Sequence, residues 1–83
     1  MTLAFVMVNT VSNQIESVLE KIREIVLEKI REIEEVEEAY MLYGVYDILA
    51  VVKAETTEEL KGIILRIRTV NHVLNTLTLM AVS

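Results

Sequence analysis

The sequence predicts a single α+β domain over residues 1–83, of the ferredoxin-like type with the element order βαββαβ. Four short apolar stretches rich in β-forming residues alternate with two stretches whose apolar residues recur at helical spacing. The turn between the second and third strands is too short for a crossover, so these strands form an antiparallel hairpin. Right-handed crossovers then place both helices on one face of a four-stranded antiparallel sheet.

The first strand and the first helix are read from the start of the chain. Residues 2–8 form a continuous apolar run, which is typical of a strand buried on both faces. From Ile15 the apolar residues recur at helical spacing, and Ser12 or Asn13 precedes them as a capping residue. Two glutamates at 34–35 close this helix weakly, because neither glycine nor proline follows.

Within this helix the octapeptide VLEKIREI occurs twice in succession, at residues 18–25 and 26–33, without a difference. The doubled sequence still leaves one apolar stripe on a helical wheel. With Ile15 as the reference, the stripe comprises Leu19, Ile22, Val26, Ile30 and Ile33. The same wheel turns Leu27 towards solvent and sets Lys29 beside the stripe, from where its ammonium reaches water.

The repeat leaves three arrangements open. The helix runs unbroken and overhangs the sheet by about two turns, or the extra residues loop out near one end, or the longer helix promotes a swapped or new contact between chains. A copy without any drift indicates a recent duplication or a deliberate insertion. The octapeptide adds no residue type suited to chemistry, so we assign no function to the repeat itself.

Alternating residues predict the central hairpin. Residues 36–43 form the second strand and residues 46–54 the third, joined by a turn at Gly44 and Val45. In each strand, successive side chains point to opposite faces of the sheet, and both faces are apolar.

The second helix and the last strand complete the pattern. Thr56 and Glu59 fit a capping box, and the apolar stripe that follows comprises Leu60, Ile63, Ile64 and Ile67. Gly62 costs this helix about 1 kcal/mol relative to alanine, which is tolerable if it lets the helix lie close to a neighbour. Residues 73–82 form the fourth strand, with Thr76 and Thr78 on one face.

The composition predicts self-association. Hydrophobic residues make up 53% of the chain, which is more than one small core can hide. The predicted sheet has helices on only one side, yet its strands are apolar on both. We therefore expect the second face to be covered by another copy of the chain, in a dimeric α/β barrel-like assembly.

Several compartments and partners are excluded or disfavoured. No apolar run is long enough to span a membrane, the N-terminus lacks the features of a signal peptide, and the chain has no cysteine, so we expect a cytoplasmic protein. The net charge is −5, with nine of thirteen acidic residues between Glu16 and Glu38. This surface repels phosphate backbones, which argues against direct binding of nucleic acid.

The chain offers no constellation for catalysis or for a metal. His72 is the sole histidine and falls in the turn before the last strand, which suits a solvated loop residue. The helical glutamates spiral around a solvated face and pair in part with Arg23 and Arg31 at a spacing of three. No pair of carboxylates has environments that differ as acid–base catalysis requires, so we expect neither an enzyme nor a metal site. An enzyme would need a polar cluster on the sheet, where only Asn75, Thr76 and Thr78 occur.

One segment resembles a known family. The run Glu38-Ala39-Tyr40, leading into residues 42–48 (LYGVYDI), is similar to the EAY and G-x-YD motifs of the Lrp/AsnC transcriptional regulators. The match falls in their C-terminal ligand-sensing domain, the RAM domain. The opening AFVMV strand, the ETTEEL helix start and the closing Val-x-x-Thr-x-Thr strand agree with it. The resemblance covers nearly the whole chain and implies the same ferredoxin-like fold.

Two departures from the family matter. The helix-turn-helix domain of the full-length regulators is missing, so the chain resembles a stand-alone sensor domain. Its first helix is longer than that of the family by about eight residues, the length of the octapeptide.

The resemblance also implies a binding site. In this family an amino-acid effector binds between dimers, near the hairpin and the closing strand. The matching residues here are Tyr43, Gly44, Tyr46, Asp47, Thr76 and Thr78. A carboxylate suits an ammonium, hydroxyls and main-chain N–H groups suit a carboxylate, and apolar walls suit a side chain. No basic residue lies in the motif, so main-chain donors would bind the effector's carboxylate.

Each of these residues also has an ordinary structural interpretation. Gly44 is the expected turn glycine, Asp47 can hydrogen-bond the hairpin backbone, and the two threonines can pack across strands.

The leading hypothesis is an amino-acid-sensing and oligomerisation module that assembles into dimers and rings. Without its own DNA-reading domain, it would act by co-assembling with full-length Lrp/AsnC regulators. The alternative hypothesis is an engineered helix-duplication variant that serves as a structural host and has no effector. Deleting residues 26–33 separates the two.

Overall fold

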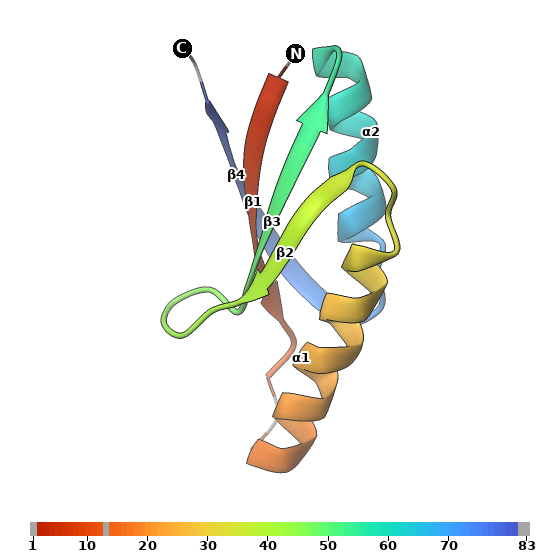
Figure 1. Cartoon of the computed structure of the whole chain (residues 1–83). Helices are drawn as coiled ribbons and strands as arrows, with labels where there is room; N and C mark the ends of the chain where they lie inside the picture. Colours follow the sequence, from red (N-terminus) through yellow and green to blue (C-terminus); the bar gives the residue numbers. More distant parts are fainter. Residues whose placement is uncertain (1, 13, 82–83) are drawn as a thin grey trace.

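The computed structural model describes residues 2–12 and 14–81, and it confirms the predicted βαββαβ fold. The elements are β1 (Thr2–Thr10), α1 (Glu16–Arg31), β2 (Val36–Met41), β3 (Ile48–Ala54), α2 (Thr57–Arg68) and β4 (Val73–Ala81). The strands form one antiparallel sheet in the order β2-β3-β1-β4. Both helices cover the same face of this sheet, as Figure 1 shows. None of the helices in the described ranges has the length and apolarity to cross a membrane.

Several predicted boundaries are wrong, and the hairpin explains two of them. Residues 42–47 form a loop that is closed where the backbone N–H of Leu42 donates to the carbonyl of Asp47 at 2.8 Å. Strands β2 and β3 are therefore shorter than predicted. Strand β1 is two residues longer, because its pairing with β4 continues to Thr10 opposite Val73.

The ends of α1 also differ from the prediction. The helix begins at Glu16 after Ile15, whose apolar side chain cannot cap it, so the predicted Ser12 cap is wrong. It ends at Arg31, before the two glutamates that were expected to close it. The alternative cap Asn13 and the predicted strand end Val82 lie outside the described residues.

The core lies between the sheet and the two helices. On β1 and β3 every second residue points into it, as the alternation predicts. Its fully buried side chains include Val6, Val8, Ile48, Val52, Leu60, Ile63 and Ile67. Residues paired across the sheet share a face. The register therefore places the remaining, alternate residues of β1 and β3, with their partners on β4, on the side of the sheet that the helices do not cover.

The uncovered side is apolar, and we call it the open sheet face. Phe5 lies between Val51 and Leu79 on this face, and Met7 lies between Leu49 and Leu77. On this face the side chains of the outer strands β4 and β2 are the most exposed, with Leu79 at 49% and Tyr40 at 47%.

The two copies of the octapeptide lie in different surroundings. Helix α1 runs without interruption through the first copy and into the second. In the second copy Val26, Leu27 and Ile30 are buried, whereas in the first copy the matching Val18 is exposed and Leu19 and Ile22 are half-buried. Figure 1 shows the first turns of α1, in orange, extending beyond the end of the sheet. The second copy therefore supplies the buried residues that α1 contributes to the core, and the first copy extends beyond the sheet.

This arrangement corrects the predicted stripe at two positions. Leu27 was expected in solvent but is 8% exposed, and Ile15 was expected in the core but is 59% exposed. The helical wheel takes Ile15 as its reference, yet the sheet underlies only the second half of the helix. Lys29, expected to reach water from the flank, does so and lies 3.8 Å from Glu32.

Helix α2 begins with the predicted Thr56 cap, but the second bond of the predicted capping box involves the N–H of Glu55 in place of that of Thr56. The hydroxyl of Thr56 accepts from the N–H of Glu59 at 3.1 Å, and the carboxylate of Glu59 reaches back to the N–H of Glu55 at 3.4 Å. Gly62 does not serve a close approach to the described residues of its own chain, because an added Cβ would meet nothing within 4 Å there.

Candidate functional site

The hairpin loop between β2 and β3 lies beside the N-terminal half of α1. Gly44 has a φ of +129°, a conformation that favours glycine, and the neighbouring Tyr43 is fully exposed. At the other end of the loop, the N–H of Asp47 donates to the carbonyl of Val8 at 3.0 Å. The loop thus presents its tip to solvent while its base is fixed to β1.

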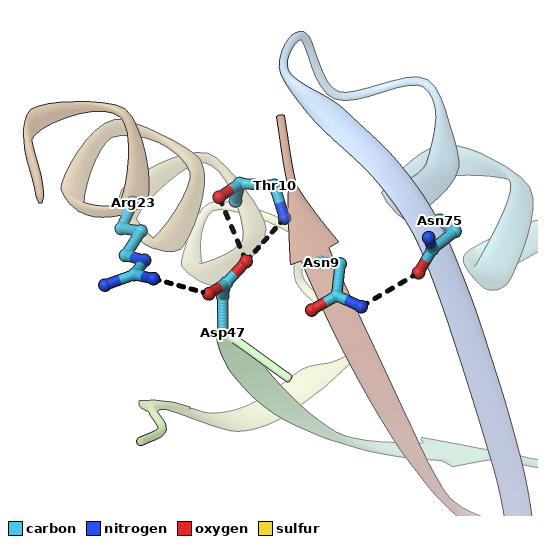
Figure 2. Close-up of polar contacts among 5 residues, drawn as sticks. All are labelled: Asn9, Thr10, Arg23, Asp47 and Asn75. Atoms are coloured by element: carbon cyan, nitrogen blue, oxygen red, sulfur yellow. Dashed lines mark hydrogen bonds and ion pairs between the residues drawn. The ribbon is translucent and has the colours of Figure 1, made fainter. Parts of the chain in front are cut away.

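Asp47 joins three segments of the chain through its carboxylate. One oxygen accepts from the N–H of Thr10 at 2.8 Å and from its hydroxyl at 3.1 Å. The other lies 2.9 Å from a terminal nitrogen of Arg23 on α1, and Figure 2 shows the carboxylate between these two partners. Its side chain is only 13% exposed. From the sequence, Asp47 was expected to hydrogen-bond the backbone of its own hairpin. The structure shows that the backbone N–H bonded to its carboxylate belongs instead to Thr10, at the end of β1.

Arg23 does not pair as predicted. Sequence spacing assigns it to Glu20, but it reaches Asp47 instead. Its counterpart in the second copy, Arg31, does pair with Glu28 at 3.2 Å and also donates to the carbonyl of Ala39 at 2.9 Å. Identical local sequences thus have different partners, because the overhang passes the hairpin loop while the second copy passes β2.

Two shallow hollows flank Arg23. The first, which we call the Asp47 hollow, has a volume of about 270 Å³ and is lined by Asn9, Thr10, Ser12, Leu19, Arg23, Val45, Asp47 and Leu74. The second, the Tyr43 hollow, has a volume of about 240 Å³ and is lined by Glu20, Arg23, Glu24, Met41, Leu42 and Tyr43. Both are lined by the overhang of α1 and the hairpin loop, the Asp47 hollow also by residues of β1 and β4 and the Tyr43 hollow also by Met41 of β2.

The structure brings some of the predicted site residues together. Asp47 and Tyr43 each line one hollow, and Gly44 shares their loop, as does the half-buried Tyr46.

The two threonines lie elsewhere in the chain. Thr76 and Thr78 are half-buried on β4, opposite Val8 and Val6, and β1 separates them from the hairpin strands. They line neither hollow. The resemblance implies a pocket between dimers, and a single chain does not form such a pocket, so the set of six stays a prediction.

Sequence reasoning missed two residues of this site. Thr10 was placed after the first strand, yet it is 4% exposed and bonds Asp47 twice. Arg23 was read as part of a solvated face. No local signal identifies either residue, because both partnerships depend on where the overhang passes the loop.

The rim of the open sheet face carries polar groups. Asn9 on β1 donates to Asn75 on β4 at 3.2 Å (Figure 2). On β2, the hydroxyl of Tyr40 donates a hydrogen bond to the carboxylate of Glu38, and this bond, together with desolvation and the charge of Glu38, raises the pKa of Tyr40. Within the described part of the chain, no group of histidine, aspartate and glutamate is arranged to hold a metal ion.

Comparison with known proteins identifies relatives of the same length. The protein TTHA0845 from Thermus thermophilus is 28% identical, with a TM-score of 0.85 over 100% of this chain and 95% of its own. The hypothetical protein PHS023 from Pyrococcus horikoshii is 30% identical, with a TM-score of 0.81 over 100% of this chain and 92% of its own.

A longer protein shares the fold. Escherichia coli AsnC is 24% identical, and 51% of its chain matches 99% of this one with a TM-score of 0.84. No curated protein sequence matches. The Lrp/AsnC ligand binding domain family matches residues 3–83. This chain therefore belongs to the Lrp/AsnC ligand binding domain family.

Proposed function

We propose that this chain is an amino-acid-sensing and self-assembling module of the Lrp/AsnC type. The observation that carries the proposal is the Asp47 hollow, which combines a carboxylate, neutral polar groups and apolar walls beside the hairpin. These groups suit a small zwitterion with an apolar side chain. A related structure supports the ligand class, since the feast or famine regulatory protein Rv3291c from M. tuberculosis, 22% identical to this chain, is complexed with L-methionine.

Self-assembly is the second part of the proposal. The open sheet face exposes Leu77 and Leu79 at 42% and 49%, and a contiguous apolar surface of this kind is typical of an interface. A second copy packed on this face would cover it and produce an α/β barrel-like dimer. Further assembly of dimers would bring Thr76 and Thr78 towards a neighbouring hairpin, and would allow mixed assembly with full-length regulators.

Calorimetric titration with the standard amino acids, beginning with L-methionine, tests the sensing role. We expect saturable binding of at least one amino acid with an apolar side chain, accompanied by a change in the mass measured by light scattering. If none of them binds, the sensing role is wrong and the assembly role remains.

A second candidate function is favoured by the overhang itself. The first copy of the octapeptide adds no fully buried side chain to the core, as expected of an insertion into a structural host. Deleting residues 18–25 or residues 26–33 gives the same shortened chain, because the copies are identical. If that chain keeps the same oligomer, an equal or higher stability and the same amino-acid binding, the insertion has no role in function.

A further inference from the structure

Arg23 is the residue that the two hollows share. It comes from the overhanging first copy of the octapeptide, so the position of its guanidinium depends on the extra length of α1. In Figure 2 its side chain extends from α1 towards the carboxylate of Asp47. The sequence motif of the hairpin contains no basic residue, and the fold supplies one from another element.

The guanidinium of Arg23 has N–H donors beyond the one that faces Asp47. An arginine side chain carries several N–H donors in a planar fork that suits a carboxylate. One terminal nitrogen of Arg23 lies 2.9 Å from a carboxylate oxygen of Asp47. Its Nε is buried and has no hydrogen-bond partner among the described residues. A buried donor left unsatisfied is costly, so this arrangement favours a further acceptor that draws the guanidinium into a new position.

The charges around Arg23 select one of the two hollows. Glu20 and Glu24 line the Tyr43 hollow and repel an anion there. The Asp47 hollow contains neutral polar residues and one carboxylate, which Thr10 and Arg23 already hold in place. A ligand with a positive and a negative end is therefore matched by Asp47 and Arg23 together.

We propose that Arg23 binds the carboxylate of the effector in the Asp47 hollow, while Asp47 accepts from its ammonium. Leu19, Val45 and Leu74 then contact the side chain, which favours an apolar amino acid. This proposal rests on the proposed sensing function, and it replaces the expectation that main-chain donors bind the effector's carboxylate.

The test compares L-methionine with L-methioninamide, which keeps the ammonium and the side chain but lacks the carboxylate. We expect the amide to bind the wild-type chain about 10-fold to 100-fold more weakly, as loss of a charge-assisted bond implies. We expect Arg23→Gln to weaken L-methionine by a similar factor relative to its amide, so that the preference of the chain for L-methionine over L-methioninamide is lost. The comparison of the two ligands on the wild-type chain does not depend on whether any variant folds. Arg23→Lys retains the positive charge and should retain part of the preference for L-methionine over its amide.

The matched control is Arg31→Gln, which changes the same position of the second copy and should leave both affinities unchanged. If the wild-type chain binds L-methionine and its amide equally, or if Arg23→Gln binds L-methionine as tightly as the wild type, the role of Arg23 is wrong while the sensing function stands. If the wild-type chain binds neither L-methionine nor any other amino acid, both proposals are wrong.

Discussion

Asp47 shows how much one side chain can determine at the scale of single residues. Its carboxylate connects β1, α1 and the hairpin loop through two bonds from Thr10 and an ion pair with Arg23. The sequence identified Asp47 as a site residue but not its partners. Hydrogen bonds to an ionised group are stronger than those between neutral groups, so this carboxylate stabilises the base of the loop as well as the candidate site.

Replacing Asp47 by Asn should lower the stability of the chain. The variant loses the negative charge that pairs with Arg23 and accepts two hydrogen bonds from Thr10. We expect a loss of about 2 kcal/mol in the free energy of unfolding. Urea denaturation measures it. Glu24→Gln is the control, because Glu24 is an exposed carboxylate next to Arg23 on α1 and should change the free energy of unfolding by less than about 0.5 kcal/mol. Equal losses in the two variants would show that the network contributes nothing.

The two glycines should respond in opposite directions to alanine. Gly62 lies in α2 with open space around its Cβ position, so Gly62→Ala should stabilise the chain by about 1 kcal/mol. Gly44 has a φ of +129°, and Gly44→Ala should destabilise it. Thermal denaturation followed by circular dichroism compares them. A lower melting temperature for Gly62→Ala would mean that the glycine serves a contact that this chain forms only in its assembly.

At the scale of elements, periodicity predicted the type and order of every helix and strand, and the alternating faces of β1 and β3. It did not predict the ends of α1 or the burial of Leu27. A helical wheel reports which residues share a face, but not where the sheet lies along the helix. In α1 that second quantity decides burial, because the sheet underlies one copy of the octapeptide and not the other.

The repeat provides a matched test of this conclusion. Ile22 and Ile30 occupy the same position of identical octapeptides, so their helix propensities and near neighbours in sequence are alike. Ile30 is fully buried, and Ile30→Ala should cost about 2–5 kcal/mol of stability. Ile22 is half-buried, and Ile22→Ala should cost less than half as much in the same denaturant titration. Equal costs would contradict the assignment of the core to the second copy.

One ion pair links α2 to the turn after α1 and should make stability depend on pH. A hydrogen bond from Arg66, 2.8 Å away, is the main cause that lowers the pKa of Glu35 from its ordinary value of 4.5. The folded chain therefore holds this proton less tightly than the unfolded chain. The contribution is present above pH 4.5 and is lost as the pH falls through the lower folded value.

Glu35→Gln should reduce this part of the acid dependence of the melting temperature, with a small effect because the pair is partly exposed. Glu34→Gln is the control, since Glu34 is the adjacent glutamate and its side chain is exposed. A steeper loss of stability in acid for Glu35→Gln would reverse the sign and contradict the role of the pair.

At the scale of the whole molecule, the sequence predicted an apolar surplus, and the fold shows where it lies. The helices cover Val6, Val8 and their neighbours, while Phe5, Met7 and their neighbours remain on the open sheet face. The family resemblance also identified the hairpin. The contribution of Arg23 could not be predicted, because it depends on how far an extended helix passes the sheet and which loop lies beside it.

The mass of the chain in solution tests the central claim most directly. Static light scattering at micromolar concentration should give at least twice the chain mass of 9.5 kDa, because in the proposed dimer a second copy covers the open sheet face. Leu79→Glu places a charge on the open sheet face, at a side chain that is 49% exposed in the single chain, and should reduce the measured mass. A wild-type chain that stays a compact 9.5 kDa monomer would contradict the account, since the open sheet face would then have no partner.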